Sequence, residues 1–265
     1  MSDLTPQALE AFLLELAEVA SEHTLPHFRT SLEVANKKGT GFDPVTVADK
    51  QAEQAIREKI LGAFPDHGIL GEEFGSHNHN AEYQWIIDPV DGTRAFICGL
   101  PVWGTLIGIY HDNTPLAGIM AQPFTVERFL SNGRESVLFH GGRRAEILTS
   151  ATTELSAAKL MATTPDMFSA PEFEAFNRLS QACQLTRYGA DCYAYCMLAA
   201  GAIDLVVESS LHVYDIAALI PIIRNAGGLV TNWRGDDAIS GGQVIAAANA
   251  EIHGAALEVL ARAAE

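Results

Sequence analysis

The sequence predicts an α+β protein whose second half is of the α/β type, with its layers packed into one compact body. Three features of the apolar pattern, together with the composition, lead to this prediction. Apolar residues follow helical spacing near the N-terminus, strand-like spacing in the middle, and an alternation of both patterns after about residue 145. Apolar residues make up 48% of the 265 positions and charged residues 19%, a composition that can fill a sizeable core.

The first half begins with two helical patterns. Thr5 can cap a helix with Pro6 in its first turn, and the following apolar residues recur at helical spacing over 12–20. A second helix is expected over 47–61, with Ala52, Ile56 and Ile60 on its apolar face. The segment FPDHG then ends this helix.

Strands are expected to follow. A short apolar run at 69–71 ends in Glu72-Glu73, and the run WII at 85–87 predicts a buried strand that stops at Asp88-Pro89. The segments 105–110, 115–122, 126–131 and 137–140 indicate antiparallel strands, and the dipeptides DN and NG supply turns between them.

The second half alternates helix and strand. Helices are expected over 170–183, 192–200, 215–225 and 251–264, and strands over 204–208, 229–231 and 244–247. We place the boundary between the halves at 145/146. Residues 1–145 form an N-terminal α+β half that carries most of the candidate metal ligands, and residues 146–265 form a C-terminal α/β half that carries Asp215 and the candidate substrate pocket.

The charge of the chain excludes several classes of partner. Lysine and arginine number 17 against 33 acidic residues, which gives a net charge of −16. Such a chain lacks the basic surface that binds nucleic acid or an anionic membrane. No apolar run is long enough to span a bilayer, and the N-terminus lacks a signal-peptide pattern, so we expect a cytoplasmic protein.

Four acidic residues each follow or begin an apolar element. Asp88 and Asp91 are three residues apart at the end of a strand, where two ionised carboxylates repel each other unless a divalent cation lies between them. An Asx turn with Asp91 as a helix cap explains the same pair without a metal. Glu72 follows an apolar run, and Asp215 begins an apolar helix that it could equally cap. Together the four match the ligands of a site for two or three Mg²⁺ ions.

Three segments carry a family resemblance. GEEFG, WIIDPVDGTRAF and YDIAALIPIIRNAGG resemble, in order and spacing, the signature segments of the inositol monophosphatase family. The resemblance extends to KGTGFDPVTVAD, which runs from Lys38 to Asp49, and it covers nearly the whole chain. It implies a layered αβαβα sandwich of the inositol monophosphatase and fructose-bisphosphatase type, together with Mg²⁺-dependent hydrolysis of a small phosphomonoester.

The resemblance also implies which residues hold the metal ions. Glu72, Asp88 and the carbonyl of Val90 would bind a first ion. Asp88, Asp91 and Asp215 would bind a second, and Glu72 would hold a third more loosely. Mg²⁺ is the expected ion, with Mn²⁺ as an alternative.

Catalytic roles follow for Glu72, Thr93 and Asp49. Thr93 would orient the attacking water with support from Asp49, while divalent ions acidify water and stabilise a leaving alkoxide. The backbone N–H groups of Gly92 and Thr93, at the start of a helix, suit phosphate oxygens.

Competing motifs fail on spacing. Phosphatases that form an aspartyl-phosphate place their two acids two residues apart, whereas Asp88 and Asp91 are three apart. The sequence has no GxSxG segment and no Walker A segment, and GTG at 39–41 lacks the third glycine of a dinucleotide-binding loop.

Details around these segments resemble the histidinol-phosphate phosphatases of the family. Inositol enzymes usually show DGTTNF where this chain has DGTRAF, and a small residue where it has Asp191. Two carboxylates, Asp191 and Glu208, would suit the ammonium group of histidinol phosphate. Asp191 could instead cap a helix that starts at Cys192. The expected substrate-binding residues are Gly92, Thr93, Arg94, Asp191, Glu208 and Asp215.

The predicted function is therefore a Mg²⁺-dependent phosphomonoesterase that acts on L-histidinol phosphate in histidine biosynthesis. An inositol monophosphatase or a hydrolase of many small phosphate esters is the alternative within this class. A regulator that binds metal or phosphate without catalysis is the alternative outside it, but such a protein would need neither Thr93 nor Asp49. The resemblance further implies a homodimer, with no nucleic-acid or membrane partner.

Overall fold

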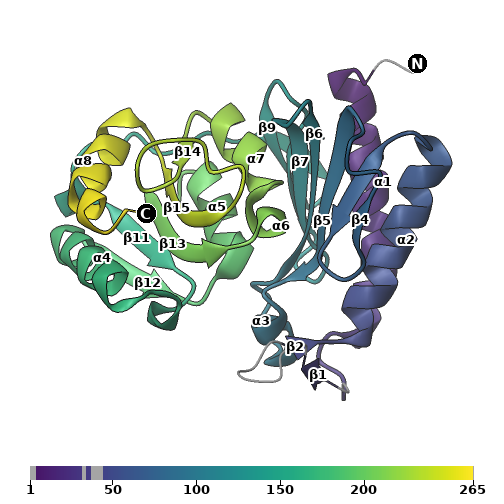
Figure 1. Ribbon diagram of the computed structural model, residues 1–265, viewed down its shortest axis with the longest axis horizontal. Coiled ribbons are helices and arrows are strands. Elements are labelled where there is room, and N and C mark those ends of the chain that lie inside the picture. The colour runs from purple at the N-terminus through teal and green to yellow at the C-terminus, as the bar shows by residue number, and fades with distance from the viewer. Residues whose placement is uncertain (1–3, 32–33, 37–43, 265) are drawn as a thin grey trace.

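Helices and sheets alternate in five layers across the computed structural model, which describes residues 4–31, 34–36 and 44–264 (Figure 1). Helices α4 (Ala170–Ala182) and α8 (Ala250–Leu260) form one outer layer, and α1 (Pro6–Thr24) and α2 (Val47–Ala63) form the other. A smaller and a larger sheet lie inside them, with α5, α6 and α7 between the two sheets (Figure 1). The predicted αβαβα sandwich is confirmed.

The larger sheet contains eight strands among the described residues, in the order β10-β9-β8-β7-β6-β5-β3-β4. All neighbours in it are antiparallel except β3 and β5. The turn between β6 and β7 uses Asp112 and Asn113, both with positive φ, as the DN dipeptide predicts. The strands of this sheet are β3 (Gly68–Gly71), β4 (Gly75–His77), β5 (Tyr83–Asp91), β6 (Gly104–His111), β7 (Thr114–Gln122), β8 (Glu127–Ser131), β9 (Ser136–His140) and β10 (Arg143–Glu146).

The smaller sheet has the order β12-β11-β13-β15-β14 among the described residues. Its strands β11, β12 and β13 are mutually parallel where they pair, whereas β15 runs antiparallel to both of its neighbours. The sequence patterns did not predict β11 and β12. The strands are β11 (Lys159–Ala162), β12 (Leu185–Tyr188), β13 (Leu205–Leu211), β14 (Leu229–Thr231) and β15 (Gly242–Ala247), and a separate pair is formed by β1 (Ala35–Asn36) and β2 (Pro44–Val45).

The two outer helices on the larger sheet, α1 and α2, begin where the sequence predicts. Thr5 caps α1, its side chain accepting a hydrogen bond from the Ala8 N–H at 3.2 Å. Thr46 caps α2 in a capping box with Asp49. The predicted apolar face of α2 is buried, but two acidic residues, Asp49 and Glu53, are buried along with it.

Three apolar clusters fill the spaces between the layers. One lies between α1, α2 and the larger sheet, a second between the two sheets around α5 and α7, and a third between the smaller sheet and the outer helices α4 and α8. The larger sheet spans residues 68–146 and the smaller one residues 159–247. The boundary at 145/146 as a division into two halves stays a prediction.

Strand β5 was expected to stop at Asp88-Pro89, but it continues to Asp91. Its pairing with β6 shifts register between Asp88 and Asp91, so Pro89 lies in a bulge where the ladder needs no N–H from it. The Pro89 carbonyl instead accepts a hydrogen bond from the Thr105 hydroxyl at 2.8 Å. The bulge therefore allows a proline inside the strand.

The helix expected over 215–225 is two helices, α6 (Val213–Ile216) and α7 (Leu219–Asn225). Pro221 explains the break, because it has no N–H to donate to the carbonyl of Ala217 and its ring crowds that carbonyl. The helix also starts earlier than expected, since His212 is the N-cap and Asp215 occupies the third helical position. The middle layer is completed by α5 (Asp191–Ala199), and a five-residue helix α3 (Thr93–Ile97) follows β5.

The α6–α7 junction rests on a pair of glycines. Gly108 on β6 and Gly118 on β7 lie opposite each other in the sheet. A Cβ atom at Gly118 would lie 2.5 Å from the carbonyl oxygen of Ala218, and one at Gly108 would lie 3.0 Å from the Ala218 nitrogen. The absence of side chains here lets the helix backbone approach the sheet, which fixes the position of Asp215 near β5.

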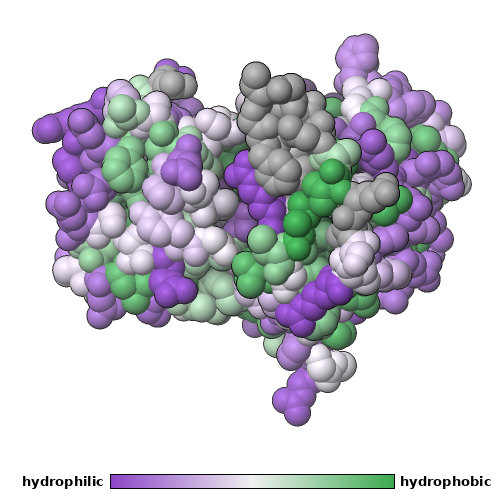
Figure 2. Space-filling model, turned by 90° about the horizontal axis from the view of Figure 1, so that it is seen from below, coloured by the Kyte–Doolittle hydropathy of each residue, from purple (hydrophilic) through white to green (hydrophobic). Residues whose placement is uncertain are grey.

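The face seen from below carries hydrophilic residues at its outer edges, while hydrophobic residues gather near its middle (Figure 2). Large apolar side chains that are exposed in the loops after α3 and β7 include Leu100 and Phe124. Some apolar surface is therefore exposed on this face, although the chain has a net charge of −16. Within the described part of the chain, no helix combines the length and the apolar character that a membrane span needs.

The glycine pair gives a test of this packing. We expect Gly118→Ala to lower the free energy of unfolding by about 1–3 kcal/mol, the usual cost of an extra carbon in a filled interior. Chemical denaturation measures this change. Gly62→Ala on α2 is the matched control, because a Cβ atom there meets no atom within 4 Å. That variant should be neutral or more stable by up to about 1 kcal/mol, and equal effects of both substitutions would contradict the close packing.

Candidate metal centre and substrate cavity

Asp88 and Asp91 are positioned by the bulge in β5. The register shift between them lets both carboxylates lie near Asp215, rather than alternating strictly across the sheet. The Oδ1 atom of Asp88 accepts a hydrogen bond from the Val90 N–H at 3.0 Å. The Oδ2 atom of Asp91 accepts one from the Cys192 N–H, in the first turn of α5, at 2.8 Å.

Asp215 reaches the same place from the opposite half of the chain. It lies in α6, and its Oδ2 atom accepts a hydrogen bond from the His212 N–H at 2.7 Å. Asp215 is therefore not the N-cap residue itself, but its carboxylate caps the helix through a capping box with His212, so part of the capping alternative to a metal role is present. One oxygen of each of the three aspartates is thus held by a backbone N–H group, and these groups come from three different segments.

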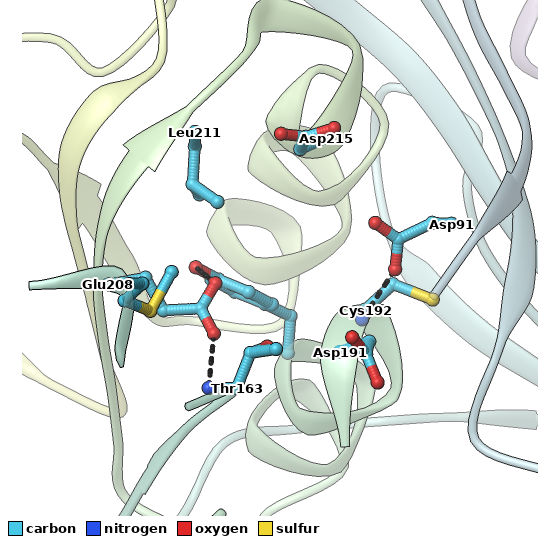
Figure 3. Close-up of a pocket in the computed structure, with 9 residues that line it drawn as sticks. Asp91, Thr163, Asp191, Cys192, Glu208, Leu211 and Asp215 are labelled. Carbon is cyan, nitrogen blue, oxygen red and sulfur yellow. Dashed lines mark hydrogen bonds between the residues drawn. The ribbon is translucent and has the colours of Figure 1, made fainter. Parts of the chain in front are cut away.

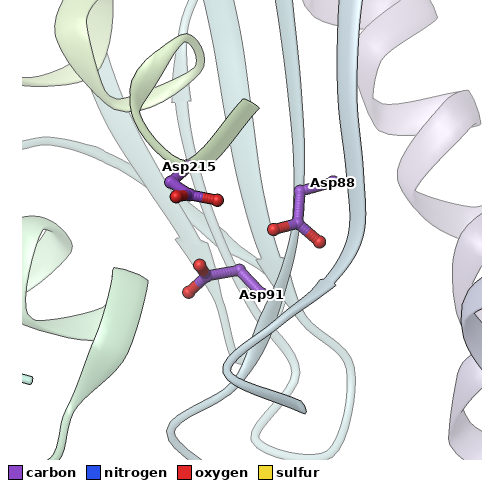
Figure 4. A group of neighbouring side chains, drawn as sticks. All are labelled: Asp88, Asp91 and Asp215. Atoms are coloured by element: carbon purple, nitrogen blue, oxygen red, sulfur yellow. The ribbon is translucent and has the colours of Figure 1, made fainter. Parts of the chain in front are cut away.

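The three aspartates form the centre of the candidate site (Figure 4). One oxygen from each of Asp88, Asp91 and Asp215 lies within 4.8 Å of the other two. Carboxylate oxygens at this spacing can share a hard divalent cation such as Mg²⁺ or Mn²⁺. The structure therefore brings together residues that the sequence separates by more than 120 positions.

The electrostatics of this cluster favour a bound cation. Burial raises the pKa of Asp88 well above its usual value, and the negative charges of the neighbouring carboxylates raise it further. Burial also raises the pKa of Asp91 well above its usual value, with the charges of Asp191 and Asp215 adding to the effect. A divalent cation would offset both causes, so the residues fit the metal that the sequence predicts.

Glu72 and Asp49 lie next to this cluster. Glu72 follows β3, and its N–H donates to the carbonyl of Ile87 at 3.1 Å, which ties it to the residue before Asp88. Its negative charge contributes to the raised pKa values of Asp88 and Asp49. Burial is the larger cause at Asp49, whose Oδ2 atom accepts from Thr46, while its buried Oδ1 atom has no hydrogen-bond partner among the described residues. An unpartnered buried oxygen here is a further sign that a cation or water completes the site.

The turn after β5 orients Val90 and Thr93. The Thr93 hydroxyl donates to the Val90 carbonyl at 3.1 Å, which leaves its oxygen lone pairs able to accept a hydrogen bond from water. Gly92 is the N-cap of α3 with φ of 79°, so Asp91 is not the cap of this helix. A Cβ atom at Gly92 would lie 3.1 Å from the side chain of Asp191, and this close approach also requires glycine.

A cavity of about 130 Å³ opens beside Asp91 and Asp215 (Figure 3). Asp191 and Glu208, two of the predicted substrate-binding residues, also line it. Five of its lining residues were not predicted, and they come from three separate segments of the second half. They are Thr163, Met167, Cys192, Tyr195 and Leu211. Cys192 and Tyr195 lie beside Asp191 in the segment GADCYAY, whose apolar and aromatic residues could have indicated a pocket wall.

Asp191 is not the helix cap that the alternative interpretation requires. The N-cap of α5 is Ala190, without a side-chain hydrogen bond, and the Cys192 N–H is bound by Asp91 instead. Asp191 itself has φ of 45°, an unusual conformation that aspartate tolerates. Burial and the charge of Glu208 raise its pKa to about 6, and the charge of Arg94 opposes them. Arg94, at the second position of α3, is exposed.

Glu208 lies on β13 and is only 2% exposed. Its Oε1 atom accepts from the Thr163 N–H at 2.7 Å, and its Oε2 atom accepts from the Tyr195 hydroxyl at 2.9 Å. These donors orient the carboxylate, while burial raises the pKa of Glu208. Two further expectations, Lys38 and the GTG segment at 39–41, lie outside the described residues.

The arrangement can bind a phosphate ester whose leaving group carries a cationic or hydrogen-bonding substituent. The aspartate cluster would hold the divalent ions at one end, and the cavity would hold the leaving group beside them. Asp91 and Asp215 border both regions. The candidate metal centre and the leaving-group pocket are therefore adjacent, because these two carboxylates belong to both.

Comparisons with known proteins agree with this geometry. A family model described as "Inositol monophosphatase family" matches residues 5–265. The chain is 38% identical to the chloroplastic bifunctional phosphatase IMPL2 of Arabidopsis thaliana, covering 98% of this chain and 78% of that protein. It is 36% identical to a histidinol-phosphatase of Chlorobaculum parvum, covering 89% of this chain and 90% of that protein.

A solved structure shares the fold. An inositol monophosphatase from Zymomonas mobilis superposes with a TM-score of 0.83 at 36% sequence identity, covering 95% of this chain and 96% of that one. The relatives thus carry two different substrate names at the same level of identity.

Metal binding should stabilise the protein in a pH-dependent way. Because burial and repulsion raise the pKa values of Asp88 and Asp91, the metal-free protein gains stability from them when both are protonated, and loses it as pH rises through their raised pKa values. Mg²⁺ binds the ionised carboxylates, so its stabilisation should grow over the same range. At 100 times its Kd we expect about 2.7 kcal/mol.

Thermal unfolding with and without Mg²⁺ at pH 5.5 and pH 8 measures this. NaCl at equal ionic strength is the control. A Mg²⁺-induced shift that is the same at both pH values, or that persists unchanged in Asp88→Asn, would contradict the assignment.

Proposed function

This chain belongs to the inositol monophosphatase family and is a phosphoric monoester hydrolase, and we propose that its substrate is L-histidinol phosphate, which it converts to L-histidinol and phosphate. The observation that supports this substrate is a pair of carboxylates in the wall of the cavity next to the aspartate cluster, the buried Glu208 and the half-buried Asp191. A hydroxyl-rich leaving group such as inositol needs one acceptor, whereas an amine benefits from both.

The cavity suits both polar parts of histidinol. Asp191 and Glu208 offer charge-assisted hydrogen bonds to the primary ammonium group. Tyr195, Leu211 and Met167 line the same cavity and offer aromatic and apolar surface to the imidazole ring. The similarity to a histidinol-phosphatase across 89% of the chain supports the same substrate.

We propose that Glu72, Asp88, the Val90 carbonyl, Asp91 and Asp215 hold two or three divalent ions, most readily Mg²⁺. These ions would supply a polarised water and neutralise the charge of the leaving oxygen. The chain itself fixes the reacting groups. Thr93, held by its bond to the Val90 carbonyl, would accept a hydrogen bond from the attacking water and orient it, with Asp49 supporting the same water.

The phosphate group would be held in the turn after β5. The N–H groups of Gly92 and Thr93 would donate to its oxygens, as backbone N–H groups at a helix start do in other phosphate sites. Arg94 would add a positive charge at the mouth of the site, near Asp191, where its charge opposes the rise in the Asp191 pKa that burial and Glu208 cause. A homodimer in the cytoplasm remains part of the proposal.

Phosphate release from a panel of esters tests the substrate. The panel contains L-histidinol phosphate, inositol 1-phosphate and glycerol phosphate, each with Mg²⁺. The proposal expects the highest kcat/KM for histidinol phosphate. A higher value for inositol phosphate would replace the substrate assignment, and the absence of hydrolysis on every ester would favour a binding protein.

Removal of one central carboxylate should abolish turnover without unfolding the protein. We expect Asp88→Asn to lower kcat/KM by about 10²–10³, as the loss of one electrostatic stabiliser does in other enzymes. Excess EDTA should abolish activity of the unchanged protein, and added Mg²⁺ should restore it. Circular dichroism verifies the fold. Full activity after verified metal removal would refute the metal-dependent mechanism.

The amine interpretation predicts a substrate-selective effect of Asp191→Asn. Loss of a hydrogen bond between charged groups should reduce kcat/KM for histidinol phosphate by roughly 10–100-fold. Hydrolysis of glycerol phosphate, which has no amine, should change by less than about twofold. The exposed Asp112 supplies a matched control, Asp112→Asn, which should leave both substrates unaffected. Equal losses on both substrates would mean that Asp191 supports the site rather than the amine.

A further inference from the structure

The ion pair between Glu53 and Arg57 on α2 contacts the turn that carries Glu72. Glu53 is fully buried, and its Oε1 atom accepts from the Arg57 Nε–H at 2.7 Å. The Arg57 side chain is 14% exposed. Neither residue contacts the cavity, and neither belongs to the candidate ligand set.

The Glu53 carboxylate binds the backbone of that turn. Its Oε2 atom accepts from the Glu73 N–H at 2.7 Å, and its Oε1 atom accepts from the Phe74 N–H at 3.2 Å. Arg57 binds the following residue of the same turn, because its Nη2 atom donates to the carbonyl of Gly75. The side chains of α2 therefore hold the chain segment between β3 and β4 at three successive residues.

Gly71 is shaped to admit this carboxylate. A Cβ atom at Gly71 would lie 1.9 Å from the Oε1 atom of Glu53, a distance that no side chain allows. The glycine that opens the GEEFG segment is thus explained by the position of Glu53. On the other side of the turn, the Glu72 N–H is bound to the carbonyl of Ile87. Glu72 is therefore held between α2 and the strand that carries Asp88.

Stability alone gives a weak reason for such a pair. Burying a carboxylate and a guanidinium costs desolvation energy that their attraction only partly repays, so an apolar pair of similar volume is often equally stable. What the pair supplies is geometry, since several charge-assisted hydrogen bonds fix one backbone conformation. From this geometry we infer that Glu53 is a positioning residue, which sets the Glu72 carboxylate against the Asp88 cluster through the backbone of residues 73–75, with Arg57 as its partner.

The inference rests on the proposed function, in which Glu72 binds a divalent ion. Asp49 lies four residues before Glu53 and Arg57 four residues after it, so these three charged side chains lie along one face of α2, with Asp49 near Glu72 and Arg57 on the turn that follows it. Outer partners of metal ligands typically change metal affinity by 10–100-fold when substituted. We expect Glu53→Gln to weaken divalent-ion binding by about this factor. The NH₂ group of glutamine cannot accept a hydrogen bond, so it would face a backbone or Arg57 N–H donor and displace the turn.

Binding of Mn²⁺, followed by electron paramagnetic resonance and calorimetry, tests this without reference to turnover. The variants are Glu53→Gln, Glu72→Gln, the double substitution and Arg57→Gln, with Glu58→Gln as control. Glu58 is exposed on the same helix, and its side chain accepts a hydrogen bond from Gln54 at 3.1 Å. Glu53→Gln should raise the Mn²⁺ Kd about as much as Glu72→Gln, and Arg57→Gln should raise it in the same direction.

The double variant separates positioning from general support. If Glu53 acts through Glu72, the double substitution should weaken Mn²⁺ binding little more than Glu72→Gln does alone. Additive losses, or an unchanged Kd in a folded Glu53→Gln, would overturn the inference. Should Glu53→Gln fail to fold, the cycle of Arg57→Gln with Glu72→Gln decides in the same way. An unchanged Kd in Glu72→Gln would instead refute the metal role of Glu72 in the proposed function.

Discussion

Three carboxylates held against their mutual repulsion are the constraint on which this structure depends. Asp88, Asp91 and Asp215 bring oxygens within 4.8 Å of one another in a buried place, where burial and repulsion raise the pKa values of the first two. Each is held there by a hydrogen bond from a backbone N–H. The fold thus stabilises an arrangement that is unfavourable by itself, and a divalent cation is the ligand that would relieve it.

Asp91 and Asp215 both lie where the larger sheet meets the middle layer of helices. Asp91 belongs to the larger sheet but binds the first turn of α5, and Asp215 belongs to the second half but lies against β5 because paired glycines let the α6–α7 backbone approach the sheet. The cavity that we propose for the leaving group is formed at this junction, with Glu208 on the smaller sheet. The proposed ion binding and substrate selection would therefore depend on the same contact between the larger sheet and the middle layer of helices.

Glycines mark the points of closest approach. Gly71 admits the carboxylate of Glu53, and Gly92 admits the side chain of Asp191 while its positive φ starts α3. Both glycines belong to segments that carry the family resemblance, GEEFG and DGT. Their role is steric: each allows an acidic side chain from a distant part of the chain to lie against the turn that bears a candidate metal ligand.

The sequence alone predicted the features that depend on near neighbours along the chain: the cap at Thr5, the helix start at Val47, the DN turn and the apolar faces of the helices. It also contained the spaced signature segments that identify the family. It failed at the bulge after Asp88, because pairing with β6 decides whether a proline ends a strand, and at Pro221, whose missing N–H divides the expected helix in two. Only the tertiary structure decided that Asp91 rather than Asp191 binds the start of α5, that Thr163 and Tyr195 orient Glu208, and that Glu53 lies beneath the Glu72 turn. These contacts join residues 13 to 101 positions apart, and their formation depends on how the layers pack rather than on any local pattern.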